Sequence, residues 1–158
     1  MRVTACSQAH TTPRIRSLAN AVGDQKKEED LARVVSACNG EFYDIIIDDG
    51  LHSAEAQQKS LKYLFRHLKP GGLYIIEDVH MLKARDVDPN KIASTCEVLQ
   101  YWNRTGTLQN SEILANTGVA DEIDFIQIPF ATGACLNLKH GRPTSYDCLP
   151  TIAIKKRN

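Results

Sequence analysis

Three features that would assign a protein class directly are missing from this 158-residue sequence. No apolar run approaches the roughly 18 residues that a membrane-spanning helix needs, and the N-terminus lacks the apolar segment of a signal peptide. The formal net charge is zero, so the chain lacks the basic surface typical of nucleic-acid binding. These absences favour a cytoplasmic protein that binds neither membranes nor nucleic acids.

The cysteines show no paired pattern. They are odd in number, scattered, and contain no Cys-x-x-Cys pair. This argues against a disulfide framework and against a thiolate metal site. We expect free thiols, mostly small core residues, at Cys6, Cys38, Cys96, Cys135 and Cys148.

The chain does carry an alternation of apolar runs and helical patterns, and its length suits one domain, residues 1–158. Periodicity and Gly/Pro punctuation predict strands at 15–22, 42–47, 73–76, 123–128 and 151–154, and helices at 26–38, 53–68 and 91–102. Residues 1–13 are polar and are expected to be irregular. The run 42–47 lacks alternation, which predicts burial on both faces. The order of elements predicts an α/β fold with a mainly parallel sheet.

Acidic residues end two neighbouring strands of the predicted sheet. Asp48 and Asp49 follow the run 42–47, and Glu77 and Asp78 follow the run 73–76. Because parallel strands end at the same edge of a sheet, these side chains can face one crevice. Carboxylates so close together repel each other unless a cation lies among them, and oxygen ligands favour Mg²⁺ or Mn²⁺. Paired acids at a strand end can instead cap the next helix or remain solvated.

Three further segments bear on the same edge. His52 lies three residues after Asp49 and could take a proton from a metal-held hydroxyl, although a lone histidine can also be structural. His80 follows Asp78 closely and could line the same crevice. The segment Gly23-Asp24-Gln25 is either a simple turn or a loop that hydrogen-bonds an adenine amino group, and spacing alone leaves both open.

Together these segments resemble a known family. "GDQ" at 23–25, "FYDIIIDDGLH" at 42–52 and "LFRHLKPGGLYIIEDVH" at 64–80 are similar to the class I S-adenosylmethionine-dependent methyltransferases. The nearest group is the metal-dependent sugar O-methyltransferases of macrolide biosynthesis, the macrocin and mycinamicin group. The resemblance implies a Rossmann-like methyltransferase fold, with a mainly parallel sheet and helices on both faces. It covers residues 23–80 well and weakens beyond them.

The resemblance also implies roles for individual residues. Asp49, Glu77 and Asp78 would be the Mg²⁺ ligands, and His52 would be the general base that deprotonates a sugar hydroxyl. The family has serine before that histidine, where this chain has Leu51.

For the methyl donor, S-adenosylmethionine, the resemblance implies three contacts. Asp24 and Gln25 would lie by the adenine, and Asp48 near the methionine end.

The segment before Gly23 departs from the family. The family has a glycine-rich turn and a further acid there, whereas the 22 residues of this chain contain no glycine. We therefore expect an N-terminally truncated, partial methyltransferase domain, in which the strand at 15–22 could lack a neighbour.

The sequence thus predicts a Mg²⁺- and S-adenosylmethionine-dependent O-methyltransferase. Its acceptor would be a hydroxyl of a small metabolite, with or without attached sugars. The alternatives are a non-catalytic remnant or interaction module that keeps the fold, and a carboxylate-metal hydrolase. The sequence leaves a homo-oligomeric assembly open.

Overall fold

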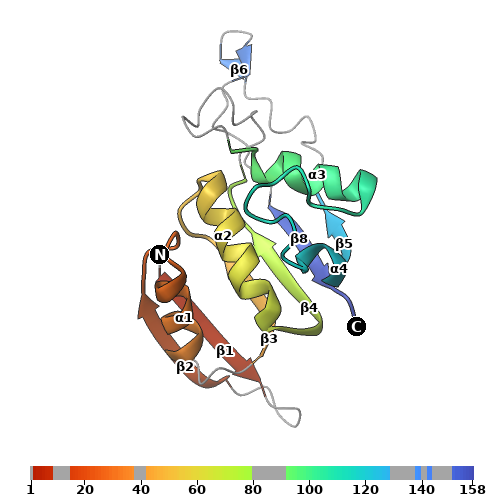
Figure 1. Ribbon diagram of the computed structural model, residues 1–158. Coiled ribbons are helices and arrows are strands. Elements are labelled where there is room, and N and C mark those ends of the chain that lie inside the picture. The colour runs from red at the N-terminus through yellow and green to blue at the C-terminus, as the bar shows by residue number, and fades with distance from the viewer. Residues whose placement is uncertain are drawn as a thin grey trace.

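The computed structural model describes residues 2–8, 15–37, 42–79, 92–128, 138–139, 142–143 and 151–158. Its elements follow one another along the chain as shown in Figure 1. They are β1 (Arg2–Gln8), β2 (Ile15–Val22), α1 (Glu28–Ala37), β3 (Tyr43–Asp48), α2 (Ala54–Leu64), a 3₁₀ turn η1 (Phe65–His67), β4 (Leu68–Ile76), α3 (Thr95–Thr105), α4 (Val119–Glu122), β5 (Ile123–Gln127), β6 (Leu138–Lys139), β7 (Arg142–Pro143) and β8 (Ile152–Lys156).

A four-stranded sheet in the order β3-β4-β8-β5 forms the centre of the fold. β3 and β4 are parallel, and β8 runs antiparallel to both β4 and β5. Three of the four strands therefore share one direction. The parallel pair needs a crossover, which α2 supplies. The predicted α/β class is confirmed, but the described sheet is mixed: β3 and β4 pair in parallel, whereas the β4–β8 and β5–β8 pairs are antiparallel.

One face of this sheet carries the core. The register aligns Ile46, Tyr74, Ile154 and Ile126 across the four strands, and these side chains belong to or pack against the buried cluster under α2 and α3. In Figure 1, α2 lies across β3 and β4.

The opposite face carries exposed apolar side chains. Ile45 and Ile47 are each 54% exposed, and Phe125 is 44% exposed. The prediction that the strand at 42–47 is buried on both faces is therefore wrong. β3 is an edge strand of the four-stranded sheet, and the described helices that contact the sheet, α2 and α3, bury side chains in the same core cluster on one face. Helices on both faces, which the resemblance implied, are not found among the described residues.

The N-terminal segment corrects a second expectation. Residues 1–13 were expected to be irregular, but residues 2–8 form β1, which pairs antiparallel with β2. The predicted strand 15–22 therefore has a neighbour, and β1 also contacts β3. The polar composition of this segment did not indicate a strand. Strands pair through their backbone N–H and C=O groups, and this pairing does not depend on which side chains the residues carry.

The helices follow the predicted patterns, with shifted ends. α1 buries Leu31, Val34 and Val35, and Ser53 caps α2 by accepting a hydrogen bond from the Ala56 amide. The second helix ends earlier than predicted, because the chain tightens into η1 and Leu68 already belongs to β4. α3 begins at a capping box in which Ser94 and Glu97 exchange hydrogen bonds.

Cys96 is a free, buried thiol, as predicted, and burial raises its pKa. Cys38, Cys135 and Cys148 lie outside the described residues. None of the described helices has the length and apolar character required to cross a lipid bilayer.

The packing of α2 on the sheet can be tested at Leu61, which is fully buried in the core. Leu61→Ala should lower the free energy of unfolding by about 2–5 kcal/mol, because it removes buried apolar surface and leaves a cavity. Urea unfolding measures the effect, and Lys62→Ala at the exposed neighbouring position is the control. A loss at Leu61 no larger than at Lys62 would contradict this packing.

Candidate metal and donor site

The ends of β3 and β4 lie side by side. Asp48 is paired with Ile76 in the parallel register, and the Glu77 amide donates a hydrogen bond of 2.9 Å to the Asp48 carbonyl. The loops that follow the two strands therefore leave the sheet at the same edge. This geometry confirms that the two acid pairs lie at neighbouring strand ends.

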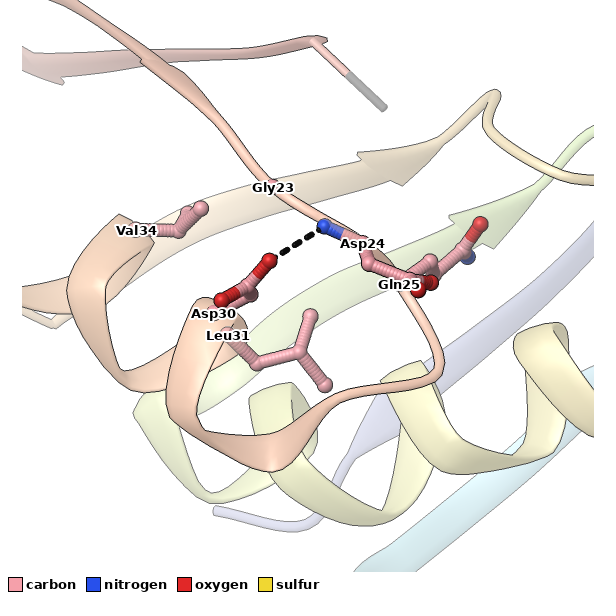
Figure 2. A pocket seen from close by; sticks show the side chains of 6 residues that line it. All are labelled: Gly23, Asp24, Gln25, Asp30, Leu31 and Val34. Carbon is pink, nitrogen blue, oxygen red and sulfur yellow. Dashed lines mark hydrogen bonds between the residues drawn. The ribbon is translucent and has the colours of Figure 1, made fainter.

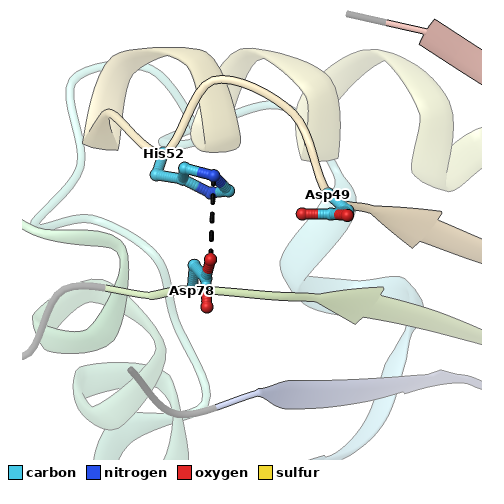
Figure 3. Close-up of side chains that lie close together, drawn as sticks. All are labelled: Asp49, His52 and Asp78. Atoms are coloured by element: carbon cyan, nitrogen blue, oxygen red, sulfur yellow. Dashed lines mark ion pairs between the residues drawn. The ribbon is translucent and has the colours of Figure 1, made fainter. Parts of the chain in front are cut away.

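Asp49, His52 and Asp78 come together at this edge (Figure 3). Each offers one ligand atom, and these atoms all lie within 4.8 Å of one another. His52 Nε2 is 3.7 Å from Asp78 Oδ2. The His52 Nδ1 atom is buried and has no hydrogen-bond partner in the described part of the chain. Asp49 is exposed, while His52 and Asp78 are half-buried, so the group is accessible from solvent.

Glu77 is not part of this group, although it follows the same strand. Its side chain is half-buried. His80, which could line the same crevice, lies outside the described residues. The predicted ligand set is thus brought together at Asp49 and Asp78 but not at Glu77.

The donor chemistry of this group suits a hard divalent cation. Two carboxylates supply the oxygen ligands that Mg²⁺ and Mn²⁺ prefer. Within the described ranges, no lysine or arginine forms an ion pair with either Asp49 or Asp78.

The backbone at Asp78 is held in an uncommon conformation. Its φ is 51°, in the left-handed region that residues other than glycine seldom adopt. The buried Gln57 side chain lies beneath this turn, with Nε2 3.3 Å from the Glu77 carbonyl and 3.5 Å from that of Asp78. Sequence reasoning missed Gln57. The available signal was a polar residue on the same helical face as Leu61 and Leu64.

A buried hydrogen-bond network connects Asp48 to the loop after β2. Gln25 Nε2 donates to Asp48 Oδ1 at 2.6 Å, and the Tyr74 hydroxyl donates to Asp48 Oδ2 at 3.2 Å. Burial raises the pKa of Asp48 to about 6, against the opposing effect of these two hydrogen bonds. Burial and the neighbouring carboxylate raise the pKa of Tyr74 as well. Asp48 therefore lies in the interior, unlike its neighbour Asp49.

Asp24 lies at a small hollow between the loop and α1, which Figure 2 shows. The Asp24 amide donates to Asp30 Oδ2 at 2.6 Å, and the Asp24 side chain is exposed. The hollow is a shallow depression with essentially no enclosed space that could hold a water molecule. Pockets that bury small-molecule ligands typically hold about 300–1,000 Å³. A nucleoside at Asp24 would therefore lie partly on the surface.

Comparison with known proteins gives relatives of one kind, although no family model matches. The chain is 45% identical over 105 residues to demethylmacrocin O-methyltransferase of Streptomyces fradiae, which covers 64% of this chain and 26% of that enzyme. It is 42% identical over 66 residues to mycinamicin VI 2''-O-methyltransferase of Micromonospora griseorubida, covering 42% of this chain and 15% of the relative. The predicted resemblance to the macrocin and mycinamicin sugar O-methyltransferases is confirmed.

The fold agrees with the sequence comparison. The MycE methyltransferase of the mycinamycin pathway, solved with Mg, SAH and mycinamycin VI, matches with a TM-score of 0.54 at 23% identity. The match covers 86% of this chain and 31% of that one. The Rossmann-like methyltransferase fold is thereby confirmed. The chain spans about a quarter or less of the length of the curated relatives named above.

The buried position of Asp48 predicts a pH dependence of stability. Because the folded state raises its pKa from 3.8 to about 6, the folded protein binds more protons than the unfolded chain between about pH 4 and 6. The free energy of unfolding should therefore fall as pH rises through this window. Asp48→Asn keeps the shape of the side chain but has no proton to bind or release. The free energy of unfolding of the variant minus that of wild type should therefore rise by on the order of 2 kcal/mol from pH 4 to pH 7.5.

Urea unfolding at the two pH values, in metal-free buffer, measures this difference. Asp121→Asn, at an exposed carboxylate in α4, is the control and should follow wild type. Parallel pH profiles for Asp48→Asn and wild type would contradict the prediction.

Proposed function

We propose that this chain acts as a Mg²⁺- and S-adenosylmethionine-dependent O-methyltransferase on a hydroxyl of a small, glycosylated metabolite. The observation that carries the proposal is the convergence of Asp49, His52 and Asp78 at two adjacent strand ends, on a methyltransferase fold. The relatives named above support it, since each is named for O-methyl transfer to a natural product.

In this proposal the cation is held by Asp49 and Asp78. Glu77 follows Asp78's strand and is proposed as a further ligand, which requires its side chain to turn toward the group. When bound, Mg²⁺ lowers the pKa of a hydroxyl that it contacts.

His52 is proposed as the general base. Its ring is part of the same group as the two carboxylates, and its half-buried side chain can be reached from solvent. The acceptor O–H proton would pass to the imidazole as the oxygen–methyl bond forms and the methyl–sulfur bond of the donor breaks. Asp78, 3.7 Å from Nε2, would stabilise the imidazolium that results.

Donor contacts are proposed at the loop after β2 and at the end of β3. The Asp24 side chain is exposed, and its Oδ1 atom accepts from the Lys26 amide at 3.0 Å, so Oδ2 would meet an adenine amino group. Asp48 and Gln25 are buried and hydrogen-bonded to each other, so they would support the donor region from beneath.

A cytoplasmic location and assembly into homo-oligomers stay predictions.

One observation favours the alternative of a non-catalytic remnant or interaction module. The hollow at Asp24 is smaller than the pockets that usually bury ligands of this size. Calorimetric titration of wild type with S-adenosylmethionine and Mg²⁺ separates the two functions. A methyltransferase should show saturable heat of donor binding. A folded protein that shows none would rule out the methyltransferase function.

The metal site makes a prediction of its own. Asp49→Asn and Asp78→Asn should each weaken Mg²⁺ binding by at least tenfold, because each removes a charged ligand while keeping its shape. Asparagine also tolerates the left-handed backbone at position 78. Calorimetry measures the dissociation constant, and Asp121→Asn is again the control. Wild-type affinity in both variants would place the cation elsewhere.

A further inference from the structure

The Gln25 side chain joins two loops that are distant in sequence. It comes from the loop between β2 and α1, yet it is only 2% exposed. Its Nε2 atom donates to Asp48 Oδ1 at 2.6 Å, and its Oε1 atom accepts from the Leu51 amide at 2.7 Å. Both ends of the amide are thus engaged by the segment that follows β3.

The backbone of that segment wraps closely around the Gln25 amide. A Cβ atom at Gly50 would overlap Gln25 Oε1 and would also lie 3.0 Å from its Cδ atom. Because Gln25 is buried and hydrogen-bonded at both ends, it cannot move aside at low cost. Glycine at position 50 is therefore part of the same contact.

We infer that Gln25 is a positioning residue for the metal site, which fixes the loop that carries Asp49 and His52. The amide it binds, that of Leu51, lies between these two residues in the chain. Holding the Asp48 carboxylate and the Leu51 amide fixes the chain on both sides of Asp49, and Leu51 is the residue directly before His52. The inference rests on the proposed function for its metal and adds a role that an adenine contact would not give Gln25.

The chain offers a matched comparison at Gln58. This side chain is 0% exposed and also uses both ends of its amide, donating to the Ala93 carbonyl at 2.7 Å and accepting from the Ser111 hydroxyl at 2.6 Å. Its partners lie before α3 and in the segment after it, not in the loop between β3 and α2. A purely structural role for buried glutamines would make the two positions equivalent.

The experiment compares Gln25→Met with Gln58→Met in the full chain. Methionine keeps the approximate volume and length and removes the hydrogen bonds. Both variants should lower the urea midpoint. Only Gln25→Met should speed hydrogen exchange of the Leu51 amide, by at least tenfold in metal-free protein, as measured by NMR. Only Gln25→Met should raise the Mg²⁺ dissociation constant, by about 10- to 100-fold, while Gln58→Met stays within about twofold of wild type.

Gly50→Ala provides a second route if Gln25→Met fails to fold. It displaces the Gln25 amide without replacing it and should give the same loss of Leu51 protection and of Mg²⁺ affinity. Unchanged Leu51 exchange and Mg²⁺ affinity in Gln25→Met, or an equal loss of affinity in Gln58→Met, would overturn the inference. Absence of Mg²⁺ binding by wild type would overturn the proposed function instead, and Leu51 exchange would still report whether Gln25 fixes the loop.

Discussion

The parallel pairing of β3 with β4 is the constraint on which the rest of the site depends. It sets Asp48 opposite Ile76 and lets the Glu77 amide bond the Asp48 carbonyl, so the two acid-bearing loops start side by side. Because side chains alternate along a strand, a slip of one residue would turn Asp48 from the core face to the solvent face. The same slip would separate Asp49 from Asp78. Register, fixed by the buried face beneath α2, thus determines whether the carboxylates meet.

This alternation also explains why two aspartates stand next to each other. Asp48, the last residue of β3, points into the core, where Gln25 and Tyr74 donate hydrogen bonds to it. Asp49 is exposed and forms a group with His52 and Asp78. Burial makes the first carboxyl costly to ionise, whereas the second is exposed to solvent. Asp48 therefore connects the end of β3 to the loop after β2, and Asp49 remains available to bind a cation.

The sequence predicted those parts of the fold that depend on local pattern or strand order. Helices α1 and α2, strand β4 and the meeting of Asp49 with Asp78 follow from periodicity and from the common edge of parallel strands. Strand β1 was missed because its pairing depends on backbone hydrogen bonds, which the side-chain pattern of a polar segment does not indicate. The contacts of Gln25 and Gln57 were missed because their partners lie some twenty or more residues away. No local pattern encodes hydrogen bonds of that separation.

The use of glutamine at both loops follows from the electrostatics of the site. Gln25 holds the loop after β3, and Gln57 contacts the carbonyls of Glu77 and Asp78 after β4. A lysine or arginine has no acceptor for the Leu51 amide, so neither could replace Gln25. In place of Gln57, either could donate to the two carbonyls, but its positive charge would then lie near Asp78, where it would compete with a metal ion for the carboxylates. A neutral amide donates and accepts hydrogen bonds without that charge. The loops can therefore be fixed in place while the acidic side chains keep the negative potential that a divalent cation requires.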